Sequence, residues 1–178
     1  MDVRAARVGR QKSQINRGNF LYNFESFMRK IKNHEYYMGK ALKVAERAAV
    51  KGHHPFAVVV VNGDGRIIWK DYNKVNKTMD PTAHAEINAI RKLCRKYKTL
   101  SLKGFTFYST TEPCPVCFAA INNAQVSAVY FGAPAHHTQF MPISAKELAK
   151  HARKYPIKVE GGILEKECLE QRERLWKR

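Results

Sequence analysis

The chain has 178 residues, 44% of them hydrophobic, which is enough for one domain with a buried core and excludes global disorder. There are 32 lysine and arginine residues against 15 aspartate and glutamate residues, so the formal net charge is +17. The longest apolar run, residues 56–61, is far shorter than the roughly 20 residues that span a bilayer. Because no secretory signal lies near Met1, we expect no membrane association, a cytoplasmic location and reduced thiols.

A basic surface attracts polyanions, so RNA or another nucleic acid is a candidate partner. The alternative is a generally basic protein that touches nucleic acid only weakly, because charge alone does not separate specific from incidental binding. Residues 1–33 contain eight basic residues and only two acidic ones. We interpret them as a basic N-terminal extension, either a nucleic-acid-binding arm or a segment docked on the domain. An organellar transit peptide and a flexible tail are the alternatives.

Helix and strand patterns alternate from residue 34 onward, and we assign residues 34–178 to one domain. An amphipathic helix is predicted over residues 35–52, where Gly52 ends it. Residues 55–73 contain two β-rich runs around Asn62-Gly63-Asp64-Gly65, which is a hairpin signal. A second helix follows over residues 83–97.

The second half of the domain continues the alternation. Strands are predicted over residues 105–110, 126–132 and 157–162, and helices over residues 114–124, 144–155 and 163–178. This order predicts an α/β domain with helices on both faces of one sheet. The hairpin strands are expected to be antiparallel and the strands joined through helices to be parallel, so the sheet is expected to be mixed.

Two motifs at predicted helix starts contain metal-binding and acid–base residue types. His84 and Glu86 stand at the first, and Cys114 and Cys117 at the second. The cysteines, at positions i and i+3, lie on neighbouring parts of one turn, and a helix N-terminus favours their thiolate forms. Two cysteines and one histidine leave tetrahedral zinc with one open position for water, as catalytic sites require. Glu86 is then the candidate base for that water.

The spacing of His84 and Glu86 limits where the metal lies. Residues two apart on a regular helix point about 200° away from each other. The two side chains therefore converge only at the end of the helix, and the metal is expected beyond its first turn.

Two other interpretations of these motifs were considered. A Cys-x-x-Cys pair is also typical of a redox dithiol, but that interpretation does not explain His84 or Glu86. A structural zinc site needs a fourth protein ligand, for which the candidates are Cys94, Cys168, His136 and His137. His-x-Glu followed by Pro-Cys-x-x-Cys is the signature of zinc deaminases, which favours a catalytic site.

The segments DPTAHAEINAIR (residues 80–91) and TEPCPVCFAAI (residues 111–121) closely resemble motifs of the cytidine-deaminase-like superfamily. The similarity is strongest to the branch that contains tRNA adenosine deaminases and guanine or guanosine deaminases. The resemblance implies a three-layer α/β/α fold with a mixed five-stranded sheet, usually assembled as a homodimer. It also implies one zinc ion per chain, with Glu86 as the proton shuttle. The implied zinc ligands are His84, Cys114 and Cys117.

The same resemblance suggests four substrate contacts. Asn73 matches an asparagine that contacts the base in this branch, and Phe56 stands where the base pocket is lined. The backbone N–H of Ala85 is a candidate hydrogen-bond donor to the substrate. His137 lies where a substrate-covering loop is expected, although an exposed loop histidine is an equally good interpretation. Trp176 is interpreted as a core or interface residue.

The implied reaction is hydrolytic loss of an exocyclic amino group, by attack of zinc-bound hydroxide with Glu86 as proton shuttle. The segment after Gly132 lacks both the Gly/Ser-rich stretch of the tRNA enzymes and the acidic pair of the guanine deaminases. We therefore favour a free purine base or nucleoside as the substrate. RNA adenosine-to-inosine editing is the alternative, because residues 91–103 hold six basic residues and no acidic one. A non-enzymatic nucleic-acid-binding protein is a third interpretation, against which the intact Glu86 argues.

Overall fold

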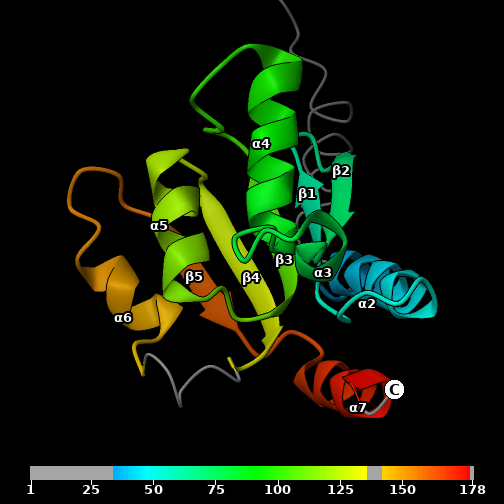
Figure 1. Ribbon diagram of the computed structural model, residues 1–178. Coiled ribbons are helices and arrows are strands. Elements are labelled where there is room, and N and C mark those ends of the chain that lie inside the picture. Colours follow the sequence, from blue (N-terminus) through cyan, green and yellow to red (C-terminus); the bar gives the residue numbers. More distant parts are fainter. Residues whose placement is uncertain (1–33, 136–141, 177–178) are drawn as a thin grey trace, which may run out of the picture.

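The computed structural model of the protein describes residues 34–135 and 142–176 (Figure 1). The predictions for the basic extension, residues 1–33, and for His137 lie outside the described residues. Within the described ranges, no helix combines the length and the hydrophobicity that a membrane span requires.

A five-stranded mixed sheet forms the centre of the domain, as predicted. Its strands are β1 (Ala57–Val61), β2 (Ile67–Tyr72), β3 (Thr106–Thr111), β4 (Ala128–Ala133) and β5 (Lys158–Gly161). They lie in the order β2-β1-β3-β4-β5. Strand β1 is antiparallel to both of its neighbours, whereas β3, β4 and β5 are parallel to one another. The hairpin is therefore antiparallel and the strands connected through helices are parallel, as the sequence indicates.

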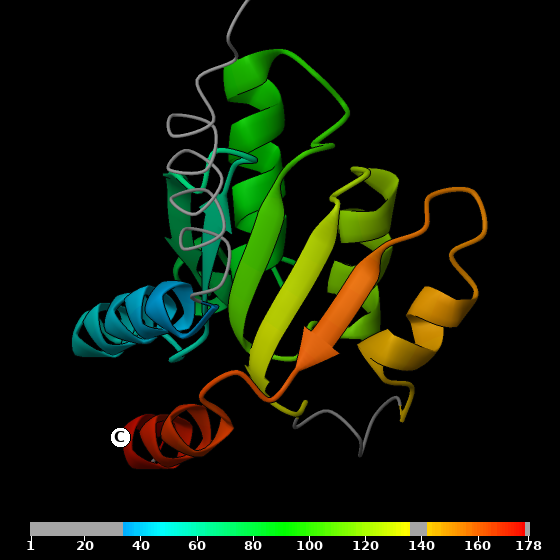
Figure 2. The ribbon, with the colours of Figure 1, turned by 180° about the vertical axis from the view of Figure 1, so that it is seen from behind.

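Helices lie on both faces of this sheet. They are α2 (His34–Val50), α3 (Val75–Thr78), α4 (Ala85–Tyr97), α5 (Pro115–Asn123), α6 (Ala145–Lys150) and α7 (Glu165–Trp176). Helices α4 and α5 lie in front of the sheet in Figure 1, and Figure 2 shows α2 and α7 on its other side. The three-layer α/β/α fold implied by the resemblance is confirmed.

Strand β1 explains why both faces of the sheet need a helix. All five of its residues are buried. Val58 and Val60 belong to the core cluster that includes α4 and α5 residues, and Val59 and Val61 to the cluster that includes α2 residues. A continuous apolar run of this kind is typical of a strand covered on both sides. The sheet thus stands between two separate cores.

Glycine determines two local turns near the start of the domain. Gly52 has φ +76°, and the N–H groups of Gly52 and His53 donate to the carbonyls of Ala49 (2.9 Å) and Ala48 (3.0 Å) at the end of α2. In the hairpin, Gly65 has φ +74°, and its N–H donates to the carbonyl of Asn62 at 2.9 Å. Both turns lie where the sequence predicts them.

Two details of the secondary structure differ from the prediction. Helix α3 was not predicted, because its four residues are too few for a periodic pattern. The helix predicted over residues 144–155 ends at Lys150 instead. Tyr155 precedes Pro156, which disfavours a helical conformation, and its carbonyl accepts a hydrogen bond from the side chain of Asn122 at 2.6 Å. The backbone is thereby directed towards β5.

Helix α7 packs on β4 at a position where only glycine fits. A Cβ atom at Gly132 would lie 2.2 Å from Sγ of Cys168 and 3.0 Å from the carbonyl oxygen of Thr110. Cys168 itself is buried, with 3% of its surface exposed. This close contact fixes the position of α7, which ends at Trp176.

We expect Gly132→Ala to lower the free energy of unfolding by about 1–3 kcal/mol, because the added methyl group overpacks this contact. Chemical denaturation measures the change. The control is Gly63→Ala, where the nearest atom to the new Cβ atom is the Gly104 carbonyl oxygen at 3.9 Å. Cys168→Ala in the Gly132→Ala background should recover part of the loss. Equal stability of the Gly132→Ala and Gly63→Ala variants would contradict the packing argument.

Candidate metal centre and catalytic site

Helices α4 and α5 both begin with a candidate ligand in an extended conformation. His84 is the N-cap of α4, with φ −68° and ψ 160°, and Cys114 is the N-cap of α5, with φ −64° and ψ 163°. Because His84 and Cys114 precede the first helical residues, their side chains do not follow the helical directions. The two-residue separation of His84 and Glu86 therefore does not force these side chains to point away from each other. The metal centre therefore lies beyond the two helix starts, as the sequence predicts.

The three predicted ligands lie together. Nδ1 of His84 is 3.3 Å from Sγ of Cys117 and 3.6 Å from Sγ of Cys114. One potential ligand atom from each residue lies within 4.8 Å of the other two. No fourth His, Cys, Asp or Glu from residues 34–135 or 142–176 belongs to this group, so Cys94 and Cys168 are not ligands.

The two cysteines interact strongly with each other. The hydrogen bond from Cys117 and the neighbouring His84 together lower the pKa of Cys114 to about 4. The same hydrogen bond, together with burial, raises the pKa of Cys117. Metal ligation requires both thiols to be deprotonated, so a cation that binds here displaces their protons. Two thiolates and an imidazole, with one position left open, are the donor set of catalytic zinc sites, so these residues fit the metal.

Glu86 lies in the first turn of α4 with only 7% of its surface exposed. Burial raises the pKa of its carboxyl group. The hydroxyl of Ser109, on β3, donates a hydrogen bond to Oε1 of Glu86 and acts in the opposite direction. The carboxylate is therefore poorly solvated and held in one orientation, which suits a general base.

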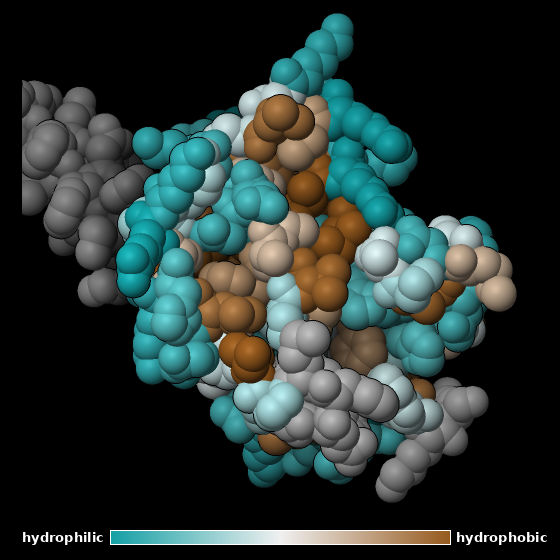
Figure 3. Space-filling model, turned by 60° about the vertical axis from the view of Figure 1, so that its left-hand side comes forward, coloured by the Kyte–Doolittle hydropathy of each residue, from teal (hydrophilic) through white to brown (hydrophobic). Residues whose placement is uncertain are grey.

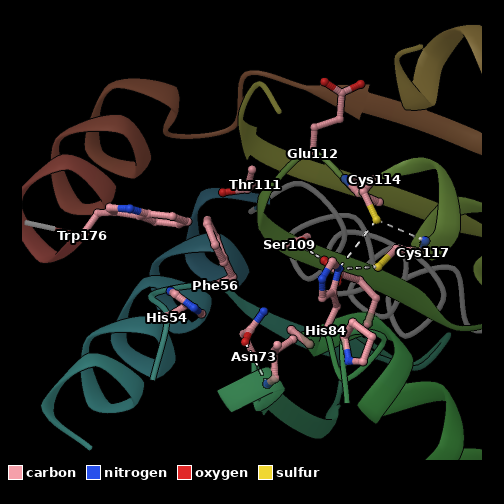
Figure 4. Close-up of a pocket in the computed structure, with 15 residues that line it drawn as sticks. His54, Phe56, Asn73, His84, Ser109, Thr111, Glu112, Cys114, Cys117 and Trp176 are labelled. Carbon is pink, nitrogen blue, oxygen red and sulfur yellow. Dashed lines mark hydrogen bonds between the residues drawn. The ribbon is translucent and has the colours of Figure 1, made fainter. Parts of the chain in front are cut away.

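Glu86 and the three candidate ligands line one cavity of about 430 Å³ (Figure 4). The cavity also contains three of the four predicted substrate contacts: Phe56, Asn73 and Ala85. The side-chain oxygen of Asn73 accepts a hydrogen bond from the N–H of Val75 at 3.1 Å. This bond fixes the amide, whose nitrogen points into the cavity (Figure 4). Ala85 lies at the N-terminus of α4, where backbone N–H groups have no acceptor within the helix.

An aromatic group forms the wall opposite the metal ligands. The ring centroid of Trp176 lies 5.1 Å from that of Phe56, with an interplanar angle of 61°, and 5.1 Å from that of His54. The interpretation of Trp176 as a core residue is wrong, since 49% of its surface is exposed and it lines the cavity, whereas its role as an interface residue stays a prediction. Nothing in the local sequence indicates this position, which depends on the docking of α7.

Two further cavity residues were not singled out from the sequence. Ser109 orients Glu86, but its sequence context does not distinguish it from any other small residue of a strand. Glu112 is buried, and its carboxylate accepts hydrogen bonds from the N–H groups of Ala135 (3.2 Å) and Ala145 (2.8 Å). Its position directly before the Pro-Cys-Pro-Val-Cys motif was the available signal. Glu112 connects β3, the end of β4 and the start of α6.

Comparison with known proteins gives consistent matches. A model of the cytidine and deoxycytidylate deaminase zinc-binding region matches residues 31–133. A tRNA-specific adenosine deaminase of Aquifex aeolicus is 41% identical over 99 residues, or 56% of this chain and 65% of that relative. A guanine deaminase of Bacillus subtilis is 40% identical over 104 residues, or 57% of this chain and 65% of that relative. The chain thus spans just under two thirds of the length of each of these relatives.

A solved structure from work on A-to-I editing by tRNA:A34 deaminases at the wobble position of transfer RNA has a TM-score of 0.67 to this chain. It is 31% identical, and the alignment covers 76% of this chain and 98% of that one. The fold and the metal-binding region are therefore shared with enzymes described for two different substrates.

We expect the purified protein to contain one zinc ion per chain. Cys114→Ser and Cys117→Ser should each lose most of the metal and lower the melting temperature, because a site with two good ligands binds zinc weakly. Elemental analysis and thermal denaturation, before and after chelation, measure both effects. Cys94→Ser, which alters a thiol outside the ligand group, is the control and should keep its zinc. A zinc content well below one per chain in the unaltered protein would contradict the assignment.

Proposed function

Because the chain belongs to the cytidine and deoxycytidylate deaminase zinc-binding family, we propose that it is a zinc-dependent hydrolase that removes an exocyclic amino group from a nucleobase. The observation that carries this proposal is the shared cavity. Three zinc ligands, a buried carboxylate and an aromatic wall line one space of about 430 Å³. A redox dithiol or a purely structural metal needs neither the carboxylate nor the wall.

The zinc ligands and Glu86 have different roles in the hydrolysis. When bound, zinc lowers the pKa of a coordinated water molecule, so that a nucleophile is available near neutral pH. Glu86 accepts a proton from the attacking water and donates it to the ring nitrogen next to the carbon under attack. The second proton of that water moves through Glu86 to the amino group, which leaves as ammonia. A carbonyl group replaces the amine, so all atoms are accounted for.

The remaining residues hold the base. Phe56 provides a flat apolar surface on which a heterocycle can stack. The amide nitrogen of Asn73 and the backbone N–H of Ala85 offer hydrogen bonds to its polar edge, which fix which amine faces Glu86. Ser109 keeps the carboxylate of Glu86 aligned throughout the proton transfers.

The preferred substrate remains a purine, as the free base or as a nucleoside. A second candidate, adenosine within tRNA, is favoured by the relatives described as tRNA-specific adenosine deaminases. The decisive test is ammonia release by the zinc-loaded protein. The panel contains guanine, guanosine, adenosine, cytosine, cytidine, a tRNA anticodon stem-loop and single-stranded DNA. Turnover confined to the stem-loop would replace the preferred substrate with the second candidate.

We expect Glu86→Gln to lower kcat by about 10²- to 10⁴-fold, because the amide cannot carry protons between water and substrate. The loss should appear in kcat, while the zinc content stays at one per chain. Glu46→Gln, at an exposed carboxylate on α2, serves as the control. Undiminished turnover by the Glu86→Gln variant would show that another group moves the protons.

The homodimer implied by the resemblance also stays a proposal, for which α5 offers a surface. Its outer face exposes Val116 and Ala119, and the face that carries α5 and α6 shows a concentration of hydrophobic side chains (Figure 3). Exposed apolar area of this kind favours association. The division into an extension (residues 1–33) and a domain (residues 34–178), and the cytoplasmic location, likewise stay predictions.

We expect the protein to have the mass of a dimer in solution, and Ala119→Arg to convert it to a monomer by placing a charge in the interface. Light scattering after size exclusion measures the mass. Val50→Arg adds the same charge at an exposed apolar position of α2 and should leave the dimer intact. A monomeric unaltered protein, or a dimeric Ala119→Arg variant, would exclude this interface.

A further inference from the structure

The cavity has two chemically different ends. The candidate ligands His84, Cys114 and Cys117 form one end, His54 and Trp176 the other, and Phe56 and Asn73 lie between them (Figure 4). Glu86 is hydrogen-bonded to Ser109, which lies beside His84 in the same view. In adenosine, the amino group on C6 and the sugar on N9 are attached at opposite ends of the fused rings. A base whose amine reaches Glu86 therefore directs its sugar towards the end formed by His54.

Four basic residues lie in the two chain segments that lead to this second end. Lys51 and His53 lie in the loop that leads to His54, and Lys74 and Lys77 flank Val75, another residue that lines the cavity. Asn76, between these two lysines, contacts Nε2 of His54 through its side-chain amide at 3.4 Å. The two segments thus meet beside the cavity. We call the four residues Lys51, His53, Lys74 and Lys77 the basic rim.

The charge of the basic rim is only partly compensated. Lys74 forms an ion pair with Asp71 at 2.6 Å. Among the described residues, no carboxylate lies within ion-pair distance of Lys51 or Lys77. Burial lowers the pKa of His53, and the positive charges of the rim lysines lower it further, Lys77 most of all. Positive groups are therefore close enough to repel one another, and an anion between them would relieve that repulsion.

We propose that the basic rim binds a phosphate group attached to the sugar of the substrate. This inference rests on the proposed deaminase function and narrows its substrate class to phosphorylated nucleosides. The phosphate belongs either to a nucleoside monophosphate or to an RNA strand, and the two present the same anion.

The test compares the affinity for a phosphorylated ligand with that for the matching nucleoside. Binding of guanosine, GMP, adenosine, AMP and an anticodon stem-loop is measured by calorimetry on the zinc-loaded full chain, in the Glu86→Gln background so that no turnover occurs. The rim variant is Lys51→Glu/Lys77→Glu. The control is Lys43→Glu/Lys154→Glu, which makes the same change of net charge at exposed lysines outside both the cavity lining and the basic segment 91–103. We expect the monophosphate to bind about tenfold more tightly than its nucleoside, and the rim variant alone to abolish that ratio.

The possible results separately test the role of the rim, the source of the phosphate and the proposed function. Rim dependence seen with the stem-loop but not with GMP or AMP supports the rim and identifies the phosphate as that of RNA. The inference is overturned if two results occur together. Nucleoside and monophosphate bind with equal affinity, and the rim variant leaves the affinity for the stem-loop unchanged. The inference is also overturned if the ratio of monophosphate affinity to nucleoside affinity falls as much in the control variant as in the rim variant. Absence of ammonia release from any substrate would instead overturn the proposed function, while the binding ratio still decides the role of the rim.

Discussion

The site depends on the convergence of two helix starts, because α4 and α5 each begin with an extended residue whose side chain points at the same place. His84 and Cys114 hold equivalent N-cap conformations, and Cys117 follows one turn later. This arrangement exists only because β3 leads into α5 beside the start of α4. The parallel pairing of β3 with β4 and the packing of both helices on one face of the sheet hold it in place.

The burial of Glu86 is a second consequence of the same geometry. A carboxylate in the first turn of a helix gains from the helix dipole, but burial makes its charged form costly. Ser109 offsets part of that cost through one directed hydrogen bond. The protein thus keeps a strong base away from solvent at the position where a water molecule must lose its proton. A more exposed carboxylate would be easier to solvate and a weaker base.

The sequence contains enough information to predict the mixed sheet, nearly all the helices and the convergence of the four candidate site residues on one cavity. Those residues are close in sequence to helix starts, and their types are chemically distinctive. Trp176 could not be placed in the same way, because it reaches the cavity only when α7 docks on the other face of the sheet, through contacts such as Cys168 with Gly132 and Gln171 with the carbonyl of Leu42. Ser109 could not be identified from the sequence for a different reason. A serine on a buried strand acquires its role only from the carboxylate opposite, which sequence spacing does not show.

The two hydrogen bonds of Glu112 have a consequence for how this domain can change during evolution. Its carboxylate binds the N–H groups of Ala135 and Ala145, so both ends of the intervening stretch are held by one side chain, two positions before Cys114. The two anchored N–H groups separate the residues between them from the metal ligands. Insertions and replacements in this stretch therefore need not disturb the metal ligands. Relatives that differ in what they accept can share an unchanged reaction centre.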